Sequence, residues 1–136
     1  MANCVITFQV DTSNLSQLNV QTKVLMTDCN QDVDDTPNDA RTFHSKVSGN
    51  TNIVWHPTSK NGTDVITISQ IANNANQPNV WSTPPQPDNN PKSNDWTAQV
   101  RAGGTASVVA DYTIYFNVNG TLNCYLDPKM EVKPGS

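Results

Sequence analysis

The chain has 136 residues, which is enough for one domain with a full hydrophobic core, and we expect a single domain over 1–136. Only 15% of the residues are charged, against about 25% in typical domains, and the polarity comes from 18 Asn and 15 Thr beside a single Glu. The net charge of −4 excludes the basic excess that nucleic-acid binding needs, and no apolar run reaches the roughly 18 residues of a membrane span. Plentiful Thr, Val and Ile disfavour a mostly helical fold.

Segments with strand character follow one another along the chain. They are 5–10, 20–26, 41–47, 52–55, 65–71, 96–102, 112–118, 121–126 and 130–132. Asn-Gly pairs at 61–62 and 119–120 are signals for two-residue hairpin turns. Short strands at this spacing, with no convincing helix, predict an all-β fold: a single antiparallel β-sandwich of the cupredoxin or immunoglobulin type.

One long linker, at about 72–95, interrupts the regular spacing of the predicted strands. It holds five of the nine prolines and seven asparagines. Because proline donates no amide hydrogen, the segment cannot be a central strand, and we expect a long Asn/Pro-rich loop. Loops of this length inside a compact domain are often functional.

The three cysteines are Cys4, Cys29 and Cys124. An odd number cannot pair completely within one chain, and no Cys-x-x-Cys motif occurs. The first residues show no basic start, apolar stretch and cleavage site of a secretory signal. We therefore expect a cytoplasmic protein with three reduced thiols, unless a signal has been removed.

Two stretches carry a family resemblance. The first is Gly49-Asn-Thr-Asn-Ile-Val-Trp55 followed by Val65-Ile-Thr-Ile68, and the second runs from Trp96-Thr-Ala-Gln-Val100 through Tyr112-Thr-Ile-Tyr-Phe116 to Asp127-Pro-Lys-Met-Glu-Val132. Over roughly 49–134 this order resembles cupredoxin-like sandwich proteins, and within them the bacterial inclusion-body family typified by PixA and AidA. The resemblance implies a cytoplasmic, non-enzymatic protein that certain bacteria make in quantity and sometimes deposit as crystalline inclusions.

Copper is the first metal that a cupredoxin resemblance suggests. Cys124 and Met130 stand where a blue-copper site would have its thiolate and axial ligand, but no His lies between them, and His44 and His56 come well before. Copper is therefore unlikely, and no cofactor is expected apart from the calcium considered next.

The acidic segment 28–39 has oxygen-bearing side chains at the spacing of an EF-hand calcium loop. The candidate calcium ligands are Asp28, Asn30, Asp32, Asp34 and Asp39. The segment departs from that loop at Val33, where Gly makes the sharp turn, and at Asp39, where Glu is usual. The alternative is an acidic, solvated connection between two strands.

Catalysis has little support in the sequence. His44 lies on an alternating segment and is expected on the solvent face, while His56 stands between Trp55 and Pro57 and is expected in a turn. Neither suggests a histidine held against a nucleophile, so we expect no enzyme activity.

The tryptophans suggest a glycan site. Indole faces stack on sugar C–H surfaces, while amide side chains pair with hydroxyls. The candidate residues are Trp81, Trp96, Asn79 and Asn94. The alternative is that Trp81 folds back and anchors the long loop to the sandwich. Trp55, which ends an apolar strand, is expected to lie in the core.

The surface as a whole favours contact between copies. Few charges mean weak repulsion, and Asn, Thr, Ser and Gln lose less side-chain entropy in a contact than Lys and Glu do. We therefore predict a self-associating structural or inclusion-type protein, forming a homo-oligomer or an ordered assembly. The alternative is a carbohydrate-binding module, with or without calcium held by 28–39. Neither role needs nucleic acid or a membrane span.

Overall fold

The computed structural model describes residues 3–29, 43–90 and 92–135. Within these ranges the chain is almost entirely β-structure, which confirms the predicted all-β class. The elements are β1 (Asn3–Val10), α1 (Val20–Lys23), β2 (Val24–Thr27), β3 (His44–Val47), β4 (Asn52–Ser59), β5 (Ile66–Asn73), β6 (Trp81–Pro87), β7 (Trp96–Val100), β8 (Val108–Val118), β9 (Leu122–Leu126) and β10 (Lys129–Val132).

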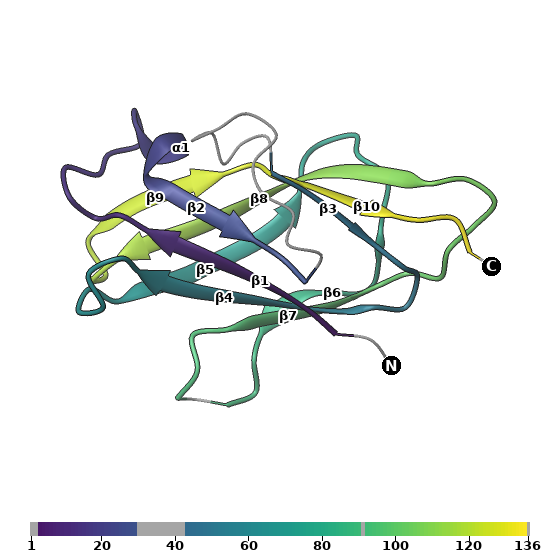
Figure 1. Ribbon diagram of the computed structural model, residues 1–136, viewed down its shortest axis with the longest axis horizontal. Coiled ribbons are helices and arrows are strands. Elements are labelled where there is room, and N and C mark those ends of the chain that lie inside the picture. Colours follow the sequence, from purple (N-terminus) through teal and green to yellow (C-terminus); the bar gives the residue numbers. More distant parts are fainter. Residues whose placement is uncertain (1–2, 30–42, 91, 136) are drawn as a thin grey trace.

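The strands form two five-stranded sheets (Figure 1). The first has the order β2-β1-β4-β7-β6. The second has the order β3-β10-β8-β5, and β9 also pairs with β8. The long strand β8 pairs with β10 near its start and with β9 near its end, while β5 lies along its other side.

The pairing in both sheets is mixed, so the expectation of a purely antiparallel arrangement is wrong. β1 runs parallel to β4, and β10 runs parallel to β3. The reason is topological, because the chain leaves the first sheet after β2, contributes β3 to the second sheet, and returns beside β1 as β4. Such crossovers produce parallel neighbours, which a hairpin cannot do.

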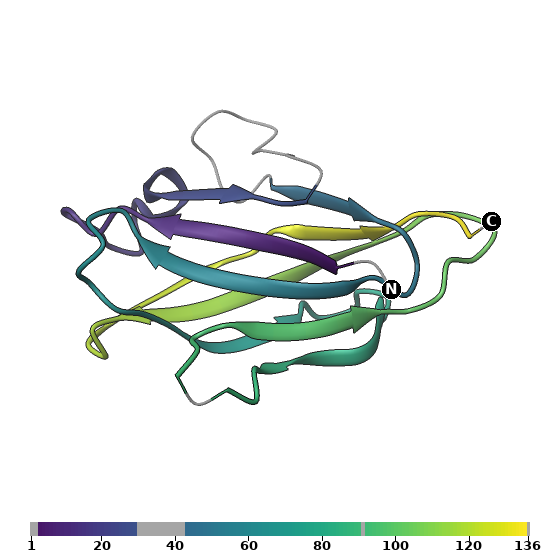
Figure 2. The same cartoon turned by 60° about the horizontal axis from the view of Figure 1, so that its bottom comes forward.

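The two sheets face each other across one cluster of buried side chains, and Figure 2 shows the layers from a second direction. Alternation puts Cys4, Ile6, Phe8 and Val10 of β1 on the buried face. Phe8 meets Phe116 of β8 with ring centroids 5.6 Å apart, so side chains of both sheets interlock in the core.

Three local expectations need correction. Residues Val20–Lys23 form a helical turn, and the strand begins only at Val24. Segment 72–95 is not one continuous loop, because it contains β6, which carries Pro84, Pro85 and Pro87. β6 tolerates prolines because it is the end strand of its sheet, where one side of the backbone makes no ladder bonds.

The third correction concerns the turn at Asn61-Gly62. The strands on either side of it, β4 and β5, lie in different sheets, so the turn joins the layers and closes no hairpin. By contrast, Asn119 and Gly120 have φ of 54° and 74°, and they join the paired strands β8 and β9. The hairpin predicted at 119–120 is therefore confirmed, since a type I′ turn needs positive φ at both central residues.

Candidate functional site

The predicted calcium ligands fall largely outside the described residues. Asn30, Asp32, Asp34 and Asp39 lie there, and only Asp28 is described. Asp28 is buried directly after β2. Burial raises the pKa of Tyr112, and the charge of Asp28 adds to this effect. Among the described residues no group of three or more His, Cys, Asp or Glu could hold a metal ion. Calcium binding by 28–39 remains a prediction.

Trp81 lies in the core at the start of β6. It is only 7% exposed, and its ring packs edge-on against Trp55 and Tyr112, with centroids 5.7 and 6.0 Å away. Its indole Nε1 donates to Oδ1 of Asn73 at 2.8 Å, and its backbone N–H donates to Oδ1 of Asn79 at 3.0 Å. Trp81 thus anchors the 72–95 segment to the core, and its indole face is not available for stacking on a sugar.

The other two predicted glycan residues lie elsewhere. Trp81 is paired with Val100, whereas Trp96 is paired with Pro87 at the opposite end of the β6–β7 ladder. Asn94 lies beside Trp96 in the chain, and its amide donates to the carbonyl oxygen of Ile66 at 3.4 Å. The structure therefore does not bring the two tryptophans together into one sugar platform.

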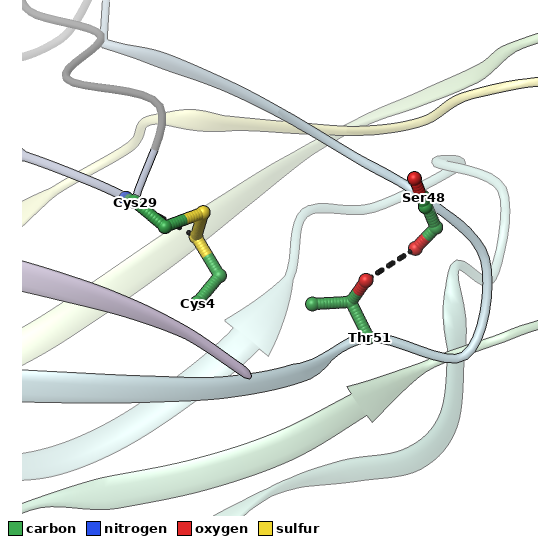
Figure 3. Close-up of a disulfide and its surroundings, with 4 residues drawn as sticks. All are labelled: Cys4, Cys29, Ser48 and Thr51. Carbon is green, nitrogen blue, oxygen red and sulfur yellow. Dashed lines mark hydrogen bonds between the residues drawn. A yellow bond between two sulfur atoms is a disulfide. The ribbon is translucent and has the colours of Figure 1, made fainter. Parts of the chain in front are cut away.

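A disulfide joins Cys4 and Cys29, so the expectation of three reduced thiols is wrong (Figure 3). The β1–β2 ladder, in which Thr7 pairs with Thr27, continues toward these two positions and brings their Cα atoms to 4.9 Å. This separation is within the range that a disulfide spans. Close to the disulfide in the same view, Thr51 donates to the carbonyl oxygen of Ser48 at 2.7 Å and closes the turn before β4.

Cys124 is the free cysteine, on β9, and burial raises the pKa of its thiol. A buried thiol of raised pKa is a poor nucleophile and a poor metal ligand at neutral pH.

Both histidines face carboxylates. His44 Nε2 lies 3.0 Å from Oε1 of Glu131, and His56 Nδ1 lies 2.6 Å from Oδ1 of Asp95. His44 is shielded by this contact, whereas His56 is half-exposed on β4 and does not lie in a turn.

The end strands of the two sheets differ in how they are protected. β6 carries three prolines, and the short β3 carries Lys46. β5 is eight residues long with the sequence ITISQIAN, which contains neither a charged residue nor a proline. Segments outside its sheet reach its two ends, where Asn94 donates to the carbonyl oxygen of Ile66 and Trp81 donates to Oδ1 of Asn73. This edge of β5 is the candidate site for pairing with another chain.

Sequence reasoning missed two exposed tyrosines on the same sheet. Tyr115 on β8 and Tyr125 on β9 lie opposite each other on its outer face. The signal was present in 112–118, because strand alternation places Tyr115 on the opposite side from Ile114 and Phe116.

Comparison with known proteins gives a family without an assigned role and a similar fold. A family model described as a domain of unknown function, DUF8788, matches residues 2–124. No curated protein matches the chain. The crystal structure of an inclusion body protein, PixA, from Burkholderia cenocepacia J2315 is similar with a TM-score of 0.62 and 12% identity, covering 98% of this chain and 95% of that one. The predicted resemblance to the inclusion-body fold is thereby confirmed. Of the helices described, none has the length and apolar character to cross a bilayer.

Proposed function

Because this chain belongs to the DUF8788 family of domains of unknown function, its role has to be argued from its own structure, and we propose that it is a non-enzymatic structural protein that associates with its own copies. The observation that carries this proposal is the end strand β5. It offers eight consecutive residues without a charge or a proline, four of them β-branched: Ile66, Thr67, Ile68 and Ile71.

An end strand of this kind has unpaired backbone groups along one side. Natural sheets usually block such edges with Lys, Pro, bulges or a covering segment. β5 has one of these devices, an irregularity in its pairing with β8 between Ile68 and Gln70, while β6 has its prolines. Pairing between copies is therefore favoured along β5 over β6.

The composition supports the same proposal. A net charge of −4 on 136 residues gives weak repulsion between copies. The fold neighbour from Burkholderia cenocepacia is named an inclusion body protein, which is consistent with ordered self-assembly in this chain.

Sedimentation velocity over a wide concentration range tests the proposal. We expect the average molecular mass of the wild-type protein in solution to rise with protein concentration. In Ser69→Lys, the same positive charge would stand on the edge strand of each copy and repel its counterpart across the new strand pair, so association should need at least about tenfold more protein, or about 1.4 kcal/mol. Ser69 is exposed, so the fold itself should tolerate the change.

The matched control is Ser82→Lys, which places the same charge on an exposed residue of the proline-protected β6. It should associate like the wild type. A strict monomer at every concentration would refute self-association. An equal loss in both variants would mean that net charge, and not the β5 edge, governs contact between copies.

A further inference from the structure

Two tyrosines form a small aromatic platform on the outer face of the second sheet. Tyr115 and Tyr125 are directly paired across β8 and β9. The two residues are 41% and 48% exposed, and their ring centroids lie 6.0 Å apart with 43° between the planes. Nearly half of each tyrosine therefore stays open to solvent.

Amide and hydroxyl groups surround these rings. The two tyrosines line a surface hollow of about 360 Å³ together with Gln17, Ser69, Gln70 and Asn123. Gln70 of β5 is paired with Tyr115 of β8, so its side chain continues the row of outward-facing side chains that the two tyrosines form.

Two of these polar groups are held in place. Gln17 Oε1 accepts the backbone N–H of Tyr125 at 2.8 Å, and its Nε2 donates to the carbonyl oxygen of Tyr125 at 3.3 Å. Ser69 Oγ donates to the carbonyl oxygen of Tyr115 at 3.2 Å. Gln17 and Ser69 therefore have set positions at the border of the hollow before any ligand arrives, and these two side chains lose little entropy on binding.

The residues that line the hollow carry no formal charge at neutral pH. The ion pairs of this sheet lie toward its other end, between Lys129 and Asp111 and between His44 and Glu131. A charged ligand would find no partner in the hollow, whereas a neutral ligand with C–H faces and many hydroxyls matches both the rings and the amides.

We propose that Tyr115 and Tyr125 form a binding site for neutral saccharides, in which a sugar ring stacks on the tyrosines and its hydroxyls bond to Gln70 and Asn123. This site contains none of the four residues that the sequence suggested for glycan binding. It shares Ser69 and Gln70 with β5 but would use their outward-facing side chains, whereas strand pairing would use the backbone edge of β5.

Affinity electrophoresis through gels that contain neutral polysaccharides (a glucan, a mannan, a xylan or a galactan) tests the site, with a microarray of neutral oligosaccharides beside it. We expect retardation in at least one gel, and at least about tenfold weaker binding for both Tyr115→Ala and Tyr125→Ala. Tyr125→Phe should keep most of the affinity because it keeps the ring. Binding should change little with salt, since no charge takes part.

The control is Leu25→Ala, which removes an exposed side chain from the other sheet and should bind like the wild type. Melting temperatures establish that each variant is folded. No retardation in any gel and no signal on the array, or unchanged binding by Tyr125→Ala, would overturn the proposal. So would a Tyr125→Ala variant that loses self-association in sedimentation but keeps any sugar binding, because the platform would then be a contact between copies.

Discussion

Trp81 shows how a single side chain organises a segment that is otherwise rich in proline and asparagine. Its ring completes a group of three aromatic rings with Trp55 and Tyr112, and Trp55 Nε1 donates to the hydroxyl of Tyr112 at 3.3 Å. The bond from Trp81 Nε1 to Asn73 ties the start of β6 to the end of β5. The two sheets are therefore linked through one indole.

We expect Trp81→Ala to lower the free energy of unfolding by about 3–5 kcal/mol, because it leaves a cavity beside Trp55 and Tyr112. Trp81→Phe should cost less, about 1–3 kcal/mol, because it keeps an aromatic ring but leaves Asn73 without its donor. Urea unfolding followed by circular dichroism measures both values. Trp96→Ala, at a partly exposed position, is the control; an equal loss there would contradict the anchoring role of Trp81.

Asp64 plays a comparable part at the other end of the molecule. Its carboxylate accepts hydrogen bonds from Thr12 Oγ1 at 2.5 Å, Asn61 Nδ2 at 2.8 Å and Asn119 Nδ2 at 3.0 Å. These bonds join three loops that lie side by side in Figure 1. Hydrogen bonds from Asn119, then Thr12 and Asn61, lower the pKa of Asp64 below its ordinary value of 3.8.

The lowered pKa of Asp64 determines the direction in which the stability of the fold changes with pH. The stabilisation is complete above the ordinary pKa of 3.8 and is lost as the pH falls through the lower pKa of the folded state. Asp64→Asn should therefore melt below the wild type at neutral pH, and the gap should close in acid. Thermal melts across pH measure this gap. Asp127→Asn, at an exposed carboxylate, should show little gap; a gap for Asp64→Asn that grows in acid would contradict the assignment.

At the scale of elements, the disulfide holds β1 to the segment that follows β2. Cys4 and Cys29 are 25 residues apart, and both flank the antiparallel pairing of these strands. A disulfide between residues this far apart in the chain stabilises a fold mainly by restricting the conformations of the unfolded chain. Disulfides are typical of oxidising compartments, so the thiol state in the cell also bears on the cytoplasmic location expected from the sequence.

We expect the double change Cys4→Ala and Cys29→Ala to lower the free energy of unfolding by about 3 kcal/mol. A reducing agent should lower wild-type stability similarly, and it should do the same in Cys124→Ala, because that residue is outside the disulfide. Counting thiols in the denatured, unreduced protein should give one. A count of three in protein alkylated as the cells are opened would place the chain in a reducing compartment.

The strands themselves were largely predictable, because their pattern is local. Alternation in 5–10 and 112–118 is visible without any partner, and Asn119-Gly120 specifies its hairpin by its own backbone preferences. β6 was missed because proline in a strand is tolerated only at a sheet edge, and edge position is a property of the whole sheet.

For the molecule as a whole, the crossings between sheets decide which edges stay open. Among the described residues β5 is an end strand because it pairs with β8 on one side, while β10 and β9 pair along the opposite side of β8. The self-association proposed along this edge should change little between low and high salt, because β5 carries no charge. Sedimentation at several ionic strengths measures this, and a steep salt dependence would point to an ionic contact elsewhere on the surface.

The candidate sites also combine features that one strand's sequence predicts with features that depend on distant segments. Exposure of Tyr115 follows from alternation along one strand, but its pairing with Tyr125 and the nearness of Gln17 depend on three separate segments. The burial of Trp81 likewise needs Trp55, Tyr112 and Asn73 to converge from other strands. Residue types at fixed spacing cannot specify such convergence.

The amino-acid sequence by itself determined the all-β class, most strand positions and the weakly charged surface. These follow from side-chain alternation, turn chemistry and composition, which act over a few residues. Only the tertiary structure decided the parallel pairs, the Cys4–Cys29 bond, the inward turn of Trp81 and the open edge of β5. Each of these joins residues distant in the chain, and such contacts form only when two sheets bury a common core.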